Sequence, residues 1–480
     1  MRKNISYSFI ATCIFFGRFF LVISVPHNFF YYGQTIDDFL FVLICFSSFF
    51  LVMTIVFFLS EKFLKKYYSK IVFVVLCLSA FPLLDYAIIS TPFFKPEINP
   101  GIKRAIYPVL LMLYVPMVII VSIKYRLERF NDRIRAIFFV MALLIIYHAI
   151  PRSFSIEHIN NKLSVASKQP IYILIFDGMS SYEVLNVPEI RPRFPNFNKL
   201  AKESFIFSGA HSPGFPTINS VPKILTGIKY SHWREENFRV LISSSDNENF
   251  VDLPVNDSIF HLAREHGYNT ILLGGAFPYC NLFGGDLTYG EAISMAARMG
   301  ELLPTPITTL LYVRPLHSRN TTLHLLSEFL SKLDTAPLNT LFFVHFTIPH
   351  DPYIFNVDGF SLKYWDHVLK GGVYKREERY MDQLQYVDKR LGEIIDKLKK
   401  NQLYDRSLII VTSDHNVLET DKTKVSLYIK APFQKEGKLV DGRYNTVNLK
   451  RFLSTFFDSG VVDINKLSDS DSQIVNAERK

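Results

Sequence analysis

Cysteine is scarce in this chain: among 480 residues there are four, and Cys280 is the only one after residue 150. A segment of 330 residues with one thiol has no internal disulfide, so burial of apolar side chains must stabilise it. Neither basic neighbours nor a helix start marks Cys280, so we expect a small buried residue there and not a nucleophile.

A basic excess is also missing from most of the chain, although the net charge is +9. Residues 1–150 contain 15 Lys and Arg against 7 Asp and Glu, whereas residues 151–480 contain 38 against 37. The second part therefore has no charge pattern suited to a polyanion, and we expect no nucleic acid among the partners.

Long apolar runs, by contrast, are abundant before residue 150. Most of them approach the roughly 20 residues that cross a bilayer as a helix. Because four more runs follow the first, a cleaved signal peptide is not expected. Residues 1–150 are predicted to form a transmembrane domain of five helices, at about 5–25, 37–60, 71–90, 105–123 and 134–150.

Lysine and arginine are unequally distributed between the two sides of this predicted domain. The amino-terminal tail and the second and fourth loops hold 11 of them, and the first and third loops hold 3. The positive-inside rule then places the amino terminus in the cytoplasm. An odd number of spans makes this a multi-pass plasma (inner) membrane protein whose residues after 150 are on the extracytoplasmic side.

Strands and helices alternate after residue 150. We predict a polar linker at 151–169, one α/β domain at 170–461 and a polar, peripheral tail at 462–480. Strands separated by helices favour a mainly parallel central sheet. Strands are expected at 171–176, 270–274, 341–346, 408–413 and 425–430, and helices at 195–203, 257–266, 321–334 and 377–400.

Two of these predicted strands end abruptly in acidic residues. Asp177 follows one continuous apolar run, and Asp414 and His415 follow another. Such runs are typical of buried parallel strands, and ligands bind at the carboxyl ends of these strands. Either aspartate alone is equally well explained by a turn or a helix cap. Together with the histidine, the two carboxylates would repel one another unless a cation lay between them, which favours a metal site.

A threonine is the candidate nucleophile. The stretch before Thr217 is rich in turn residues, and the stretch after it becomes apolar and helical. A hydroxyl at such a junction lies near amide donors and the positive end of a helix dipole, which suit a phosphate or sulfate oxygen. The alternative is an ordinary helix cap.

Two histidines near another strand end are candidates for binding substrate. His350 lies in the segment Pro349-His-Asp-Pro352, where it can hold a substrate oxygen or protonate a leaving group. His345 lies inside the predicted strand, where a purely structural role is the alternative.

The order of these motifs resembles the alkaline phosphatase superfamily, in its sulfatase-like branch, over about residues 170–455. The five amino-terminal spans are similar to those of lipoteichoic acid synthases and lipid A phosphoethanolamine transferases. The matching segments are Phe176-Asp-Gly178, Pro216-Thr217 with the helix after it, Gly267-Tyr-Asn-Thr270, Pro349-His-Asp-Pro-Tyr353, Tyr386-Val-Asp388 and Ser413-Asp-His415.

This resemblance implies an α/β fold of the alkaline phosphatase and sulfatase type after the five-helix domain. It also implies one divalent metal ion, zinc or manganese with magnesium as a further candidate. Thr217 would be the nucleophile. The implied metal ligands are Asp177, Thr217, Asp414 and His415.

The chain departs from the family pattern at two points. Sulfatases carry Cys or Ser followed by x-Pro-x-Arg, the signal for conversion to formylglycine, whereas Thr217 is followed by Ile218-Asn-Ser220. After His415, Asn416 replaces the usual glycine, and the glutamate- and histidine-bearing segment of the transferases is missing. Formylglycine chemistry and a second metal are therefore not expected.

Three functions remain open. The first transfers a phosphoryl-linked head group, of phosphoethanolamine or phosphoglycerol type, from a membrane lipid donor to a surface glycan or lipid-linked glycan acceptor. The second hydrolyses phosphate or sulfate esters on exported polysaccharide, and the third is an inactive binding domain. The complete candidate set argues against the third. Five spans favour the first, because a lipid donor requires a site held at the bilayer, whereas a tether needs one span.

Overall fold

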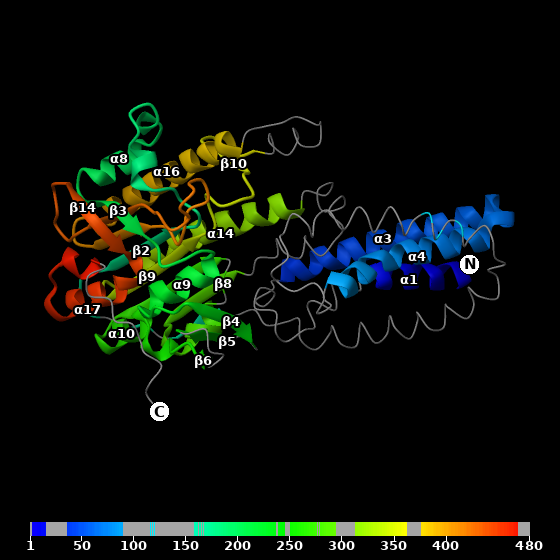
Figure 1. Ribbon diagram of the computed structural model, residues 1–480, viewed down its shortest axis with the longest axis horizontal. Coiled ribbons are helices and arrows are strands. Elements are labelled where there is room, and N and C mark those ends of the chain that lie inside the picture. The colour runs from blue at the N-terminus through cyan, green and yellow to red at the C-terminus, as the bar shows by residue number, and fades with distance from the viewer. Residues whose placement is uncertain are drawn as a thin grey trace. The chain divides into compact units, whose positions relative to one another are not determined.

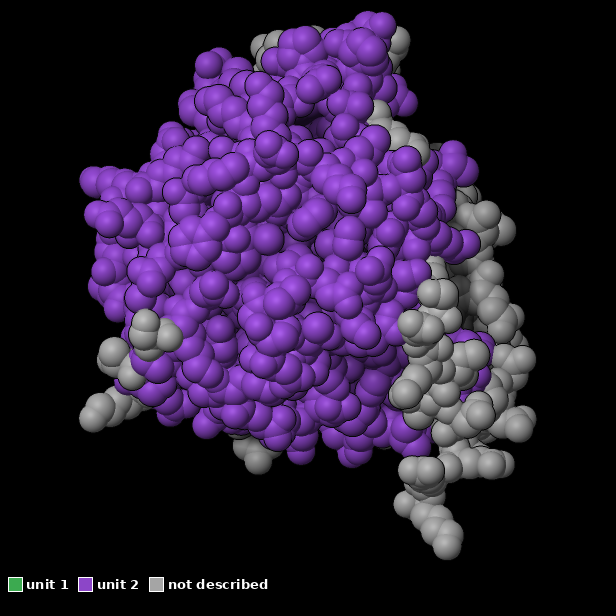
Figure 2. Space-filling model, turned by 90° about the vertical axis from the view of Figure 1, so that its left-hand side faces the viewer, with its two compact units in different colours: residues 1–28, 34–155, 299–311 green, residues 29–33, 156–298, 312–480 purple. Residues whose placement is uncertain are grey.

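The structure is a computed structural model of the full chain. It divides into two compact units, residues 1–28, 34–155 and 299–311, and residues 29–33, 156–298 and 312–480. Figure 2 shows one face of the second unit. The residues that the structure describes are 2–15, 36–89, 116, 118, 120, 158–161, 163–164, 166, 168–236, 239–244, 250–275, 277, 279–293, 313–361 and 376–468.

The first unit is helical in its described part. Its helices are α1 (Arg2–Phe15), α3 (Ile36–Phe63), the short η1 (Lys65–Tyr67) and α4 (Tyr68–Ile89). Apolar side chains of α1, α3 and α4 pack together, including Ile10, Phe57 and Leu76. Among the described residues, one helical segment, Phe46–Phe63, is long and apolar enough to cross a membrane. The last two predicted spans lie almost wholly outside the described residues, so the five-helix domain stays a prediction.

The second unit is built on a nine-stranded sheet, in the order β1-β8-β7-β9-β2-β12-β13-β3-β14 (Figure 1). The five strands from β8 to β12 pair in parallel, and β1 and β13 are antiparallel to their neighbours. The prediction of a mainly parallel sheet is therefore confirmed. The strands are β1 (His158–Asn160), β2 (Ile171–Phe176), β3 (Phe205–His211), β7 (Asn269–Gly275), β8 (Tyr289–Ile293), β9 (Thr340–Phe346), β12 (Leu408–Thr412), β13 (Leu427–Lys430) and β14 (Lys438–Asn445).

Helices cover both faces of this sheet because side chains alternate along its central strands. In β2, Ile171, Ile173 and Ile175 belong to one apolar core, and Tyr172 and Leu174 belong to the other. The first core is closed by α9 (Thr217–Thr226), α10 (Ile259–Glu265) and α17 (Leu449–Ser459). The second is closed by α8 (Pro195–Ala201), α14 (Val313–Thr335) and α16 (Arg376–Lys400).

Smaller elements complete the second unit. The short helices are α7 (Tyr182–Leu185), α11 (Tyr279–Phe283), η3 (Arg191–Arg193), η4 (Val255–Asp257), η5 (Gly284–Asp286), η6 (Thr446–Asn448) and η7 (Ile464–Leu467). Two small antiparallel sheets are formed by β4 (His232–Glu236), β5 (Arg239–Ser243) and β6 (Val251–Asp252), and by β10 (Phe355–Asn356) and β11 (Gly359–Phe360).

The structure differs from the sequence prediction at both borders of the α/β domain. Within the expected linker, His158–Asn160 forms the edge strand β1, paired with β8. Within the expected peripheral tail, Leu467 is buried in the first core. The polar composition of these segments gave no signal for the β1–β8 pairing or for the burial of Leu467. The reason is that an edge strand and a terminal turn bury few of their side chains. Cys280 is buried in the core, as expected.

Candidate active site

The acidic residues of the site lie at the carboxyl ends of two adjacent parallel strands. Asp177 follows β2, and Asp414 and His415 follow β12, which pairs with β2 in parallel register. All three side chains are almost completely buried. His415 Nε2 lies 3.4 Å from Asp177 Oδ1 and 3.5 Å from Asp414 Oδ2. The structure therefore brings Asp177 together with Asp414 and His415, which follow it by more than 230 residues in the sequence.

A glycine turn holds the two strand ends in contact. Gly178 has φ +75°, and a Cβ atom there would lie 2.9 Å from Val417 Cγ1. Its amide lies 3.3 Å from Asp414 Oδ1 and donates to it. Ser413 Oγ donates to the Phe176 carbonyl at 2.7 Å. The glycine is required because both the left-handed backbone and the close approach exclude a larger side chain.

Thr217 is the first residue of α9, and its hydroxyl reaches the same carboxylate. Thr217 Oγ1 donates to Asp414 Oδ2 at 2.7 Å and lies 3.3 Å from His415 Nε2. No side-chain cap is present at the start of this helix. The Thr217 hydroxyl is thus directed at the acidic cluster and not at the amides of its own helix.

Two buried carboxylates this close together are costly without a cation. Burial, and then the charge of Asp414, raise the pKa of Asp177 well above its ordinary value, against a smaller opposing effect of His415. Burial also acts to raise the pKa of Asp414, but His415, His345 and the hydrogen bond from Thr217 hold it below the ordinary value. The cluster therefore contains one stable negative charge and one carboxylate that needs a positive partner.

The residues present fit a divalent metal ion. Asp177 Oδ1 is buried and has no hydrogen-bond partner. The ligand atoms of Asp177, His350 and His415 lie within 4.8 Å of one another, as do those of Asp177, His345 and Asp414. Carboxylate oxygens, a hydroxyl and an imidazole are suitable ligands for zinc, and their oxygen-rich part suits manganese or magnesium. The chemistry of this donor set does not select one metal.

His350 lies in the loop after β9, beside the cluster. Its Nδ1 lies 3.0 Å from the Asp351 carbonyl, so Nδ1 carries the proton and Nε2 is left for the site. The ring centroids of His350 and His415 are 5.8 Å apart. This side chain is partly exposed, which allows it to meet a substrate.

His345 lies within β9 and is completely buried. Its Nε2 lies 4.0 Å from Asp414 Oδ2 and has no hydrogen-bond partner. Burial lowers the pKa of His345 to about 4, so the ring is neutral at physiological pH. The side chain therefore faces the site, and its position inside the strand is as predicted.

Two residues that sequence reasoning missed support these histidines. The Tyr279 hydroxyl lies 2.5 Å from His345 Nδ1. Gln383, buried on α16, donates to the carbonyls of Pro349 and His350 and accepts from the amides of Ile354 and Phe355. The available signal for Gln383 was a polar residue on the apolar face of a predicted helix. Tyr279 had no local signal, because its partner is 66 residues away.

Two other motif residues have structural contacts. Asp388 accepts hydrogen bonds from the amides of Asn196 and Phe197 at the start of α8, so it fixes that helix. Asn416 closes the short loop after His415 by donating to the Asp421 and Lys424 carbonyls. Neither side chain has a recorded contact with the metal-ligand candidates.

Comparison with known proteins gives one family match. Residues 172–435, more than half of the chain, match the family model described as Sulfatase. No curated protein gave a significant match.

Similar solved structures include three bacterial proteins. A phosphonate monoester hydrolase of Agrobacterium radiobacter is 16% identical, covering 61% of this chain and 74% of its own, with a TM-score of 0.41. One from Silicibacter pomeroyi is 13% identical over 61% and 73%, with a TM-score of 0.40. An alkaline phosphatase superfamily protein from Vibrio parahaemolyticus is 15% identical over 62% and 68%, with a TM-score of 0.39. At these scores, the family assignment rests on the sequence match.

Proposed function

The chain belongs to the sulfatase family, and we propose that it is a metal-dependent transferase of a phosphoryl-linked head group. A domain of this family makes the protein an enzyme that acts on phosphate or sulfate esters. Within that class, we propose a phosphoethanolamine- or phosphoglycerol-type group as the group transferred. The donor is a membrane lipid, and the acceptor is a surface glycan or a lipid-linked glycan.

The observation that carries this proposal is the position of the Thr217 hydroxyl. It donates to Asp414 at 2.7 Å, at the start of a ten-residue helix and beside a buried, unpartnered Asp177 oxygen. A threonine hydroxyl is a weak nucleophile unless a base or a cation activates it. A carboxylate that can act as a base and candidate ligands for a cation both lie here. The amide groups at the helix start favour the negative oxygens of the ester.

The nature of this residue favours phosphate over sulfate as the reacting group. Threonine cannot be converted to formylglycine, and the motif that signals this conversion is absent after Thr217. A covalent phosphothreonine carrying the head group then becomes the intermediate. This intermediate suits transfer, because a second hydroxyl can displace the threonine oxygen.

The two half-reactions balance with the residues at the site. In the first, Thr217 Oγ1 passes its proton to Asp414 and bonds to phosphorus, while the bond from phosphorus to the lipid oxygen breaks. Protonated His350 donates a proton to that leaving oxygen. In the second, the glycan hydroxyl attacks phosphorus, its proton returns to His350, and the threonine oxygen leaves and recovers its proton from Asp414.

A divalent cation held by Asp177, Thr217, Asp414 and His415 would supply Lewis acidity, lowering the pKa of the Thr217 hydroxyl and offsetting charge on the phosphoryl oxygens. Asp177 then acts only as a ligand, in agreement with its unpartnered oxygen. We assign His345 to the binding of a substrate oxygen, because its Nε2 faces the same cluster from β9, which pairs with β2 on the side away from β12.

The membrane part of the proposal is supported by the first unit. On α3, the apolar side chains of Leu51, Ile55 and Phe58 are exposed within the segment that is long enough to span a bilayer. We propose a multi-pass plasma-membrane location with the α/β domain on the extracytoplasmic side. This location agrees with the 11-to-3 imbalance of basic residues, and it would give the enzyme access to a lipid donor.

Mass spectrometry of Thr217 after incubation of the full chain with membrane lipids tests the proposal. We expect a phosphodiester adduct on Thr217 whose mass identifies the transferred group. The adduct should be absent from Thr217→Ala and present in Thr226→Ala, a matched control on the same helix whose hydroxyl bonds to the Pro222 carbonyl.

Adding a glycan acceptor should discharge the adduct faster than water does. Equal rates of discharge with and without acceptor would favour the hydrolase alternative. An active Thr217→Ala variant without any adduct would overturn the covalent mechanism.

A further inference from the structure

A second group of polar side chains surrounds a cavity of about 360 Å³ beside the nucleophile helix α9. Among the residues that the structure describes, three basic side chains line it and no carboxylate does. We call it the cationic cavity. Its lining residues are Pro213, Lys223, Lys229, Tyr230, Arg443 and Asn445.

Lys223 is the most informative of these residues, because it is buried. Its side chain belongs to α9 and the residue is 6% exposed. Its Nζ donates to the Pro213 carbonyl at 3.3 Å and lies 4.4 Å from the centre of the Tyr230 ring. Burial lowers the pKa of Lys223 to about 8, and no carboxylate raises it again. A buried ammonium with these neutral partners is stabilised by an anion.

The cationic cavity lies at the sheet edge that carries the candidate active site. Arg443 and Asn445 are at the carboxyl end of β14, which runs parallel to β3 and pairs Asn445 with His211. The chain leaves the same end of β3 to reach Thr217. Lys223 is six residues after Thr217, so along the helix axis the two are separated by roughly 9 Å. An extended substrate can therefore span both sites.

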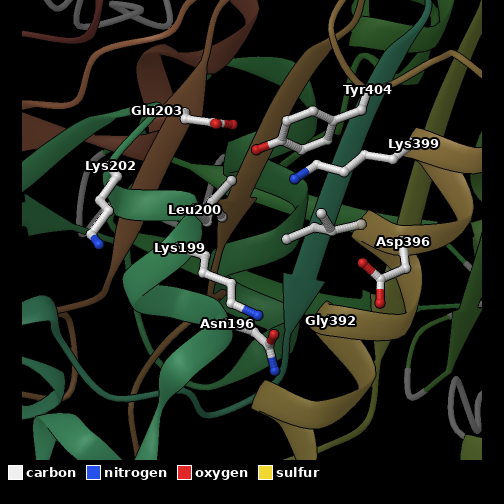
Figure 3. A pocket seen from close by; sticks show the side chains of 10 residues that line it. Asn196, Lys199, Leu200, Lys202, Glu203, Gly392, Asp396, Lys399 and Tyr404 are labelled. Atoms are coloured by element: carbon white, nitrogen blue, oxygen red, sulfur yellow. The ribbon is translucent and has the colours of Figure 1, made fainter.

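Another cavity in the second unit has lining residues of both charges. It has a volume of about 310 Å³ and lies between α8 and α16 (Figure 3). Lys199, Lys202 and Lys399 line it, but so do Glu203 and Asp396. Because acidic groups accompany its lysines, this cavity gives no comparable reason to expect an anion, and it supplies a matched control.

We propose that the cationic cavity binds a second anionic group, a phosphate or sulfate carried by the glycan acceptor. This inference rests on the proposed function for the identity of the acceptor. A glycerophospholipid donor of the proposed type has one phosphate in its head group, and that phosphate reacts at Thr217. The second anion must therefore belong to the acceptor, and the site selects an anionic glycan. Lys223, Lys229 and Arg443 supply charge-assisted hydrogen bonds to its oxygens.

Titration of inorganic sulfate into the full-length protein tests the site without any turnover. The protein is first stripped of metal with a chelator, because without a cation the negative charge of Asp414 disfavours sulfate at the catalytic cluster. We expect one saturable site, weakened roughly tenfold or more in Arg443→Gln and in Lys229→Gln. Lys199→Gln, in the cavity of Figure 3, should bind sulfate like the wild type. Thermal unfolding checks that each variant is folded.

Absence of saturable binding, or equal affinity in wild type and Arg443→Gln, would overturn the site. Because no turnover is measured, this result is independent of whether Thr217 forms an adduct.

Kinetics then test the assignment to the acceptor. With phosphorylated and unmodified forms of one glycan, the ratio of kcat/KM should favour the phosphorylated form in the wild type and fall about tenfold in Arg443→Gln. A change in the KM of the lipid donor instead, or an unchanged ratio, would overturn the acceptor assignment.

Discussion

The Tyr279 hydroxyl and His345 Nδ1 lie 2.5 Å apart in the buried centre of the second unit. Burial raises the pKa of Tyr279 well above its ordinary value, so the hydroxyl keeps its proton. Among the described residues, the hydrogen-bond partner of the Tyr279 hydroxyl is His345 Nδ1. Because the hydroxyl donates to Nδ1, the neutral ring carries its own proton on Nε2. In this tautomer, His345 is a hydrogen-bond donor that faces Asp414, which suits the binding of a substrate oxygen better than the coordination of a metal.

The variant Tyr279→Phe tests this relationship. We expect His345 to become a mixture of tautomers, kcat to fall about tenfold and the free energy of unfolding to fall by about 1 kcal/mol. Nitrogen-15 NMR of the imidazole reports the tautomer directly. Tyr268→Phe is the matched control, because its hydroxyl donates to the Gln169 carbonyl at 3.2 Å and has no recorded contact with His345. A proton on Nδ1 in the wild type would contradict the argument.

The raised pKa of Asp177 makes a prediction about pH. Below the ordinary value of 3.8, both the folded and the unfolded chain hold this proton. As pH rises above 3.8, the unfolded chain releases the Asp177 proton before the folded chain does. The free energy of unfolding of the metal-free protein should therefore decrease with pH until the raised pKa of the folded state is passed. Asp414 has the opposite shift, and its contribution is complete above 3.8.

Denaturant unfolding of the metal-free protein between about pH 4 and pH 8 measures this effect. The free energy of unfolding of the wild type should decline relative to that of Asp177→Asn. Saturating zinc or manganese should abolish the decline, because a bound cation stabilises the carboxylate. Parallel pH profiles for the two proteins would show that Asp177 has no raised pKa and would remove the main argument for a cation there.

Gln383 connects α16 to the loop that carries His350, through hydrogen bonds to the Pro349 and His350 carbonyls. In Gln383→Leu, the buried amides of Ile354 and Phe355 lose their acceptor, so the free energy of unfolding should fall by about 3 kcal/mol. We expect activity to fall about 10- to 100-fold, less than the ~10²- to 10⁴-fold loss for His350→Ala. Gln385→Leu, which removes only an exposed contact with Arg193, should change neither quantity appreciably.

A double variant separates positioning from stability. If Gln383 acts through His350, adding Gln383→Leu to His350→Ala should lower kcat no further, although it still lowers stability. Multiplicative losses in kcat would instead assign Gln383 an effect independent of that histidine.

The site residues that could be predicted from the sequence are those that follow the central strands β2 and β12. The strands before Asp177 and Asp414 are buried on both faces, so each is a continuous apolar run with an abrupt polar end. The edge strand β14 has mostly exposed side chains and was not predicted, because only Val440 is buried in it. Arg443 was therefore missed as well. Tyr279 acts through a contact with a residue 66 positions away, for which local periodicity has no signal. For Gln383, periodicity shows a polar residue on the apolar face of a helix but not the distant backbone groups that it contacts.

Reporter fusions test the proposed orientation of the chain in the membrane. A reporter that is active only outside the cytoplasm should work when fused after residue 160 and fail when fused near residue 66 or residue 130. The reason is that basic residues are in excess in the amino-terminal tail and in the second and fourth predicted loops. By the positive-inside rule, these segments stay on the cytoplasmic side. A reporter active only in the cytoplasm, fused at the same three positions, should give the inverse pattern and serves as the control. Activity of the external reporter at residue 130, or its silence at residue 160, would place the candidate site in the cytoplasm and exclude a cell-surface glycan as its acceptor.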